Sequence, residues 1–182
     1  MRQYEFAADA DTVAALRMLG RPWAQCSASE YCVDVRLASG ELVRISADGD
    51  DLEPMFECFR IHARIFGDHD VRDRDDVCSE GAARVTLLRS EQWLTAPDGT
   101  EPTDLVGELV YNQGRGKPGS RPWSALAACE VDDGVLIVAG DGRHLLIRCA
   151  TMPTTIDITR DTMAIGQWLM GCDLTELVGE DT

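Results

Sequence analysis

The chain has 182 residues, 45% of them hydrophobic and 27% charged, so it can bury a core and is neither fibrous nor wholly disordered. Its 32 acidic and 17 basic residues give a formal net charge of -15, which disfavours direct binding to nucleic-acid phosphates. No apolar run approaches the roughly 18 residues that span a bilayer, and the acidic N-terminal residues are unlike a signal peptide. We therefore expect a folded cytoplasmic protein that contacts neither nucleic acid nor membrane directly.

The first third of the chain predicts a strand, a helix and a hairpin. A short strand at 3–7 precedes a helix at 11–19. The helix has apolar residues at helical spacing, and Asp9 or Asp11 can cap its first turn. From residue 31 onward the apolar residues recur with a period of two, which predicts strands at 31–37 and 42–45 around a turn at 38–41, and then a turn at 48–51.

The middle of the chain predicts short strands separated by polar loops. Residues 59–65 alternate strictly between apolar and basic side chains, which favours a strand over the helix that Pro54 could begin. The stretch 67–81 has no periodicity and is expected to be a surface loop. Three further strand candidates follow at 84–88, 92–95 and 105–111.

The last third predicts a second hairpin and a closing helix. A loop rich in glycine and proline at 112–122 is the best internal boundary, and it would divide the chain into 1–111 and 112–182. The elements expected beyond it are strands at 135–138 and 144–148 around an Asp-Gly turn, a strand at 154–159, and a helix at 162–170 capped by Asp161.

These elements predict an α+β fold, built mainly from antiparallel β-hairpins with two or three short helices in a single compact domain, 1–182. The tripeptide Arg-Pro-Trp precedes each hairpin, at 21–23 and at 121–123. An internal duplication that forms two related β-rich halves is therefore a hypothesis.

Seven cysteines occur without the two-residue spacing of a zinc knuckle or redox pair, so we expect a reducing compartment and thiols that fill the core. Four metal-type ligands nevertheless share one stretch: Cys58, His62, His69 and Cys78. Their spacing is loose for zinc, since Cys58 and His62 would lie about 13 Å apart along a strand. We expect no cofactor and keep, as an alternative, a metal-dependent hydrolase or small metal-binding protein centred on Cys58, His62 and His69.

A basic stripe of Arg60, His62 and Arg64 lies on one face of the strand expected at 59–65. Arginine forks match carboxylates and phosphates, so these residues are candidate anion contacts. The simpler interpretation is a set of cross-strand ion pairs, with Asp34 or with acids of the loop that follows.

A second group of candidate anion contacts, Arg115 and Lys117, lies in the glycine-rich segment 114–120. The segment superficially resembles a phosphate-binding loop. Pro118 follows the lysine where that motif requires serine or threonine, so we expect a surface loop.

Two acidic segments carry the main functional hypothesis, because concentrated negative potential steers and orients a basic partner. Their candidate partner-binding residues are Asp48, Asp50, Asp51, Glu53, Asp68, Asp70, Asp73, Asp75 and Asp76. Neither segment matches a calcium-binding loop. The simpler interpretation is a solvated face that keeps the protein soluble.

The sequence holds no nucleophile elbow, no zincin motif and no dinucleotide-binding glycine pattern. We therefore predict a non-enzymatic acidic binding protein of bacterial or phage type, an inhibitor or immunity-like protein that covers a basic surface of a protein partner. A third hypothesis is a structural or regulatory subunit whose partner buries Trp93, Trp123 or Trp168.

Overall fold

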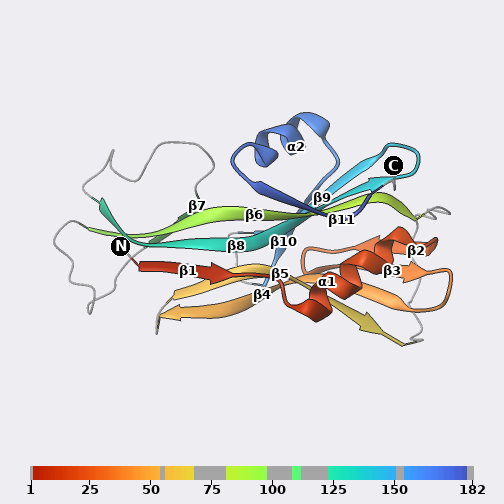
Figure 1. The fold of residues 1–182 in the computed structure, drawn as a ribbon, viewed down its shortest axis with the longest axis horizontal. Coiled ribbons are helices and arrows are strands. Elements are labelled where there is room, and N and C mark those ends of the chain that lie inside the picture. Colours follow the sequence, from red (N-terminus) through yellow and green to blue (C-terminus); the bar gives the residue numbers. More distant parts are fainter. Residues whose placement is uncertain are drawn as a thin grey trace.

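The computed structural model describes residues 2–53, 56–67, 81–97, 108–111, 123–150 and 154–179. In this part of the chain most residues lie in antiparallel strands, accompanied by two α-helices, in agreement with an α+β fold dominated by sheet. The strands form a large and a small sheet, which lie one above the other in Figure 1. No helix of the described residues is long and apolar enough to cross a lipid bilayer.

The small sheet is an antiparallel meander. Its strands, in spatial and chain order, are β2 (Trp23–Ala28), β3 (Cys32–Leu37), β4 (Leu42–Glu53) and β5 (Phe56–Phe66). Val33, Val35, Val43 and Ile45 are fully buried, whereas Asp34 and Arg44 within these pairs are at least partly exposed, so the predicted period of two is confirmed. Gly40 has a φ of +102° in the predicted turn, a backbone conformation that glycine adopts without steric cost.

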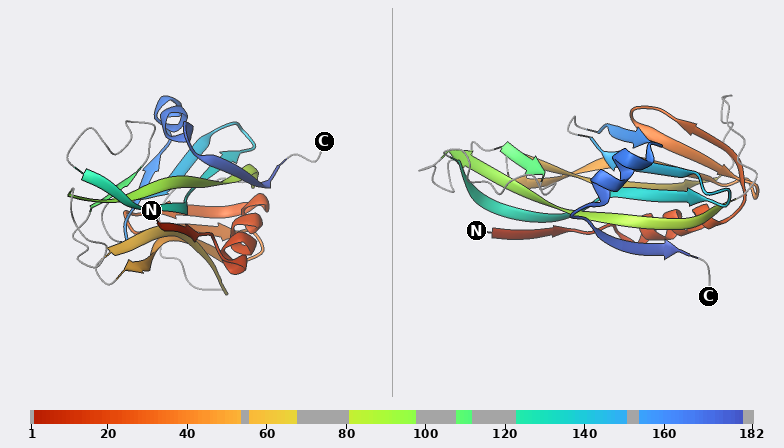
Figure 2. Two further views of the ribbon diagram at one scale, coloured as in Figure 1. Left: turned by 60° about the vertical axis from the view of Figure 1, so that its left-hand side comes forward. Right: turned by 90° about the horizontal axis from the view of Figure 1, so that it is seen from above.

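The large sheet is organised around two long central strands. Its described members are β1 (Arg2–Phe6), β6 (Ala82–Pro97), β7 (Glu108–Tyr111), β8 (Trp123–Ala139), β9 (His144–Cys149), β10 (Ile156–Thr159) and β11 (Asp173–Val178). β6 and β8 pair along most of their length, and Figure 2 shows them running through the long axis of the molecule. β1 and β9 pair with successive parts of β8, and β11 and β7 pair with successive parts of β6.

The predicted helices are confirmed as α1 (Ala10–Arg17) and α2 (Thr162–Leu169), and the turn η1 (Met18–Gly20) extends the first. Of the two possible caps for α1, Asp9 is the one used: its carboxylate accepts a 2.7 Å hydrogen bond from the Thr12 backbone N–H. Asp161 caps α2. α1 packs beside β5, and α2 lies on the side of the large sheet away from the small one (Figure 1).

Buried side chains form a main core and a smaller second core. The main core joins α1, the small sheet and residues such as Val85, Val135 and Ile147 of the large sheet. Leu88, Leu136 and Leu146 join Ile165 of α2 in the second core. The large sheet therefore buries apolar residues on two faces, which explains its runs of consecutive apolar residues.

The predicted strands differ from the structure in four respects. The turn expected at 48–51 lies inside β4, which continues to Glu53 in register with β5. The strands expected at 84–88 and 92–95 are parts of one strand, β6, because pairing with β8 continues through the polar residues between them. β11 was not predicted, and β1 pairs with β8 in the parallel direction.

The proposed repeat is described at 21–23 and at Trp123, whereas the proposed boundary 112–122 lies outside the described residues. Trp23 begins β2 in the small sheet, and Trp123 begins β8 in the large sheet. β6 and β8, which lie on either side of the segment 112–122, pair with each other.

Candidate functional site

The outer face of the small sheet carries a polar hollow of about 290 Å³ between β4 and β5. Its lining residues are Arg44, Ser46, Ala47, Asp48, His62, Arg64 and Phe66. Arg44 is the cross-strand neighbour of Arg64, and Ser46 is that of His62. Strand pairing thus brings together side chains that are up to twenty-two positions apart in the sequence.

Arg44 is fixed at the edge of this hollow by two neighbours. Its Nε and Nη2 each donate a 2.7 Å hydrogen bond to the carboxylate of Asp34, the bidentate arrangement that suits a guanidinium. Its guanidinium also lies 5.6 Å from the centre of the Phe66 ring. These contacts restrict the Arg44 side chain before any ligand arrives.

Arg64, His62 and Asp48 form a second fixed group. The Nε of Arg64 donates a 2.6 Å hydrogen bond to Nε2 of His62. Because guanidinium nitrogens only donate, we assign the proton of the neutral imidazole to Nδ1. This Nδ1 is buried and has no hydrogen-bond partner among the described residues; it lies 3.9 Å from Oδ2 of Asp48. The two nitrogens of His62 therefore face Arg64 and Asp48.

The predicted basic stripe is divided between two roles. His62 and Arg64 line the hollow, whereas Arg60 donates a 2.7 Å hydrogen bond to the carbonyl of Ala7 and ties β5 to the segment before α1. Asp34, offered as an ion-pair partner for the stripe, pairs with Arg44 instead. Arg115 and Lys117 lie outside the described residues.

The metal-ligand candidates occupy different surroundings. Cys58 is fully buried, and its thiol lies 3.8 Å from Oε1 of Gln92 on β6. His62 faces the hollow, and His69 and Cys78 lie outside the described residues. Within the described ranges, no three histidine, cysteine or acidic residues are grouped as a metal site.

The structure does not describe the side chains of most of the predicted acidic residues. Asp48 is exposed at the hollow. Asp50, Asp51 and Glu53 lie on β4, and their side chains are not described. The acidic residues Asp68, Asp70, Asp73, Asp75 and Asp76 lie outside the described part of the chain.

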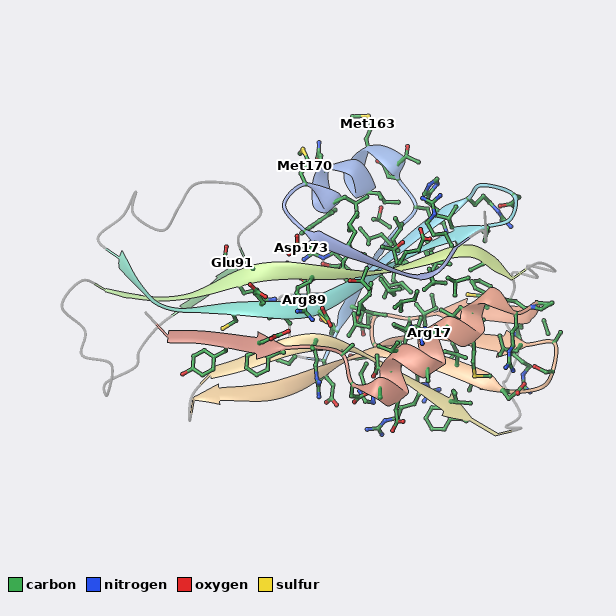
Figure 3. The ribbon with its side chains drawn as sticks, viewed as in Figure 1. Arg17, Arg89, Glu91, Met163, Met170 and Asp173 are labelled. Atoms are coloured by element: carbon green, nitrogen blue, oxygen red, sulfur yellow. The ribbon has the colours of Figure 1, made fainter. Side chains whose placement is uncertain are left out.

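A different group of acidic residues, which the sequence did not single out, meets on one face of the large sheet. Glu5 of β1 and Glu91 of β6 are both direct cross-strand neighbours of Glu130 on β8. In the adjacent row, Arg89 is the neighbour of Asp132 on one side and of Asp173 on the other. We call these six residues the acidic rows; Figure 3 labels Arg89, Glu91 and Asp173.

Arg89 is the guanidinium around which these carboxylates gather. It contacts Glu5 at 2.6 Å and Asp132 at 2.7 Å, and it lies 4.0 Å from Glu130. Asp132 is buried and also accepts a 2.7 Å hydrogen bond from the backbone N–H of Ala8. The side chains of Glu5 and Glu130 are 63% and 62% exposed, so the outer part of the rows presents negative charge to solvent.

A buried ion pair lies inside the large sheet. Arg148 of β9 donates a hydrogen bond to the carboxylate of Asp133, which also accepts a 2.8 Å bond from the Ser90 hydroxyl. Burial raises the pKa of Asp133, and Arg148 and Ser90 oppose that rise. Within the described part of the chain, Oδ1 of Asp133 and Nε of Arg148 have no hydrogen-bond partner, so the pair is incompletely satisfied.

Close packing encloses this ion pair. The guanidinium of Arg148 lies 4.2 Å from the centre of the Trp168 ring on α2. A Cβ on Gly134 would meet Cγ of Arg148 at 3.0 Å, so the glycine leaves room for the arginine stem. Trp168, predicted to be exposed for a partner, is thus half-buried over Arg148, and the side chains of Trp93 and Trp123 are not described.

Three buried or half-buried thiols lack the character of nucleophiles. Burial raises the pKa of Cys129 to about 11 and raises the pKa values of Cys149 and Cys172. Because the thiolate is the reactive form, these residues act as packing groups at neutral pH.

Comparisons with protein-family models, with curated proteins and with solved structures find no match.

Proposed function

We propose that the protein is a non-enzymatic binding protein that holds a basic surface of a protein partner against the acidic rows. The observation that carries the proposal is the register of Glu5, Glu130 and Glu91 on three adjacent strands. Like charges directly opposite one another destabilise a sheet. A chain that needed only solubility could place its acidic residues apart, so this arrangement favours a role in binding.

The strands that carry these carboxylates form a rigid support. Glu130 and Glu91 lie on β8 and β6, the longest pair of strands described, whose neighbouring residues are buried. A rigid backbone does not have to be ordered on binding, and complementary potential accelerates encounter with a basic partner. An inhibitor or immunity-like protein that covers a basic site requires such a surface.

The test uses two variants with the same change in net charge. The row variant carries Glu5→Gln, Glu91→Gln and Glu130→Gln. The control variant carries Asp11→Asn, Glu30→Gln and Asp157→Asn, three exposed residues outside the acidic rows.

Wild type and both variants are immobilised and exposed to an extract of the source cells at low and moderate salt, and captured proteins are quantified. We expect basic proteins captured by the wild type to be retained by the control variant and lost from the row variant. The wild-type capture should fall with added salt, because exposed charges are screened over about 10 Å at 0.1 M ionic strength. Equal capture by the two variants would contradict the proposal.

A further inference from the structure

We propose that the hollow on the small sheet binds a small oxyanion, a carboxylate or a phosphate, between the guanidinium groups of Arg44 and Arg64. The hollow is formed by β4 and β5, whereas the acidic rows lie on β1, β6, β8 and β11. The inference is therefore independent of the proposed function.

The register of β4 and β5 favours an anion between the two arginines. Arg44 and Arg64 are direct cross-strand neighbours, so two positive charges stand opposite one another. Such a pair is destabilising unless negative charge compensates it. Asp34 supplies one carboxylate, on the far side of Arg44, and the carboxylate of Asp48 lies against His62. Among the described residues, the charge of Arg64 is therefore left for an anion in the hollow.

Both guanidinium groups have N–H donors beyond those bonded to Asp34 and His62. A guanidinium has five N–H donors. The bonds to Asp34 use Nε and Nη2 of Arg44, so its Nη1 is not used there. The bond to His62 uses only Nε of Arg64, so neither terminal nitrogen of Arg64 is used there. Ser46, which lies in the same lining, adds a hydroxyl donor.

Both guanidinium groups are held in place before a ligand binds. Arg44 is held by Asp34 and Phe66, and Arg64 is held by His62. His62 is a positioning residue, since its Nε2 orients Arg64 while its Nδ1 faces Asp48. Preorganised donors lower the entropic cost of binding, which favours recognition of a small ligand.

The size and charge of the hollow limit the occupant. A volume of about 290 Å³ accommodates a small molecule rather than a polymer segment. The exposed carboxylate of Asp48 at the same hollow repels a second negative group. Both features select a compact ligand with one oxyanion and exclude a polyanion such as a nucleic acid.

The experiment is an NMR titration of the full-length protein with sodium acetate and, separately, with inorganic phosphate, at constant ionic strength. The probes are the side-chain Nε–H signals of Arg44 and Arg64 and the ring signals of His62. We compare the wild type with Arg64→Gln and with the matched control Arg84→Gln. Arg84 is 59% exposed on β6 and pairs with Glu176, so its loss removes the same charge elsewhere.

We expect saturable shifts with at least one anion, weakened on the order of ten-fold or more by Arg64→Gln and unchanged by Arg84→Gln. Saturation with acetate alone assigns a carboxylate ligand, and saturation with phosphate alone assigns a phosphate. His62→Gln should also weaken binding, with a change in the Arg64 Nε–H signal that a loss of general stability would not produce.

Two results would overturn the inference: no saturable response to either anion in the wild type, or equal weakening by Arg84→Gln and Arg64→Gln. Arg64 is exposed, so its substitution should leave the thermal unfolding midpoint close to that of the wild type. Arg64→Lys, which keeps the charge and loses the planar fork, provides a second variant and should bind with intermediate strength.

Discussion

Asp9 stabilises α1 as an ionised carboxylate, and this makes its contribution dependent on pH. The hydrogen bond from the Thr12 backbone N–H, followed by that from the Thr12 side chain, lowers the pKa of Asp9 below its ordinary value of 3.8. A group whose pKa is lower in the folded protein stabilises it above the ordinary pKa. That stabilisation is lost as the pH falls through the lowered value.

We therefore expect Asp9→Ala to reduce the free energy of unfolding by about 1 kcal/mol near neutral pH, as for other N-cap losses. The difference from the wild type should shrink as the pH falls below 3.8. Urea unfolding across a pH series measures both quantities. Asp9→Asn is the control, because asparagine caps without a charge; a deficit of the alanine variant that persists unchanged in acid would show that ionisation is irrelevant.

Sequence reasoning succeeded for residues whose partners are local and failed where the partners are distant. Asp9 and Asp161 were identified as caps because a cap bonds to residues two or three positions ahead. The pairing of Asp133 with Arg148 and Ser90 spans fifteen and forty-three positions. No local sequence spacing indicates that pair.

At the scale of elements, α2 is the helix most weakly attached to the described structure. Ile165 is its one buried residue, and Met163 and Met170 are 74% and 65% exposed (Figure 3). Trp168 and Leu169 are only half-buried against the second core, and Trp168 also stacks on Arg148. Helices with few buried contacts open locally before the whole protein unfolds.

Ile165→Ala should therefore accelerate amide hydrogen exchange in α2 with a much smaller effect on β6 and β8. Loss of a buried isoleucine removes about 2–5 kcal/mol of packing, and here that loss falls on the second core. Met163→Ala is the matched control, since a mostly exposed side chain contributes within about 0.5 kcal/mol. A uniform acceleration over the central strands would show that α2 opens only with global unfolding.

The element predictions failed where tertiary pairing replaced local preference. The acidic and glycine residues at 48–51 are typical of a turn, yet cross-strand bonds from β5 hold them in β4. Arg89 and Ser90 interrupt the apolar pattern of β6, and carboxylates on β8 accept hydrogen bonds from both side chains. β11 was missed because it is an edge strand with four exposed residues in succession, which removes the buried face that periodicity detects.

At the scale of the whole molecule, the candidate surfaces depend on strand register. The basic residues of the hollow were partly foreseen, because His62 and Arg64 alternate along one strand. The acidic rows were not, since their members come from four strands whose order and register no single segment encodes. Net charge was visible in the sequence, but its concentration on one face was not.

This concentration of charge predicts how stability responds to salt. A net charge of -15 destabilises the compact state by self-repulsion, and the register of Glu5, Glu130 and Glu91 places two pairs of like charges directly opposite each other. Each like-charge cross-strand pair costs about 0.2–1 kcal/mol. The row variant also loses the ion pair of Glu5 with Arg89, but an exposed pair of this kind contributes at most about 1 kcal/mol. The row variant should therefore be more stable than the wild type at about 20 mM salt, where screening is weakest.

Thermal and urea unfolding between about 20 and 200 mM NaCl tests this expectation. The wild type should gain stability with salt, and the row variant should gain less because its closest repulsions are already removed. The control variant, with the same net charge, should resemble the wild type more closely, since its three substitutions lie at separate exposed positions. If the two variants were equally stabilised, net charge alone would account for the effect, and the rows would carry no special repulsion.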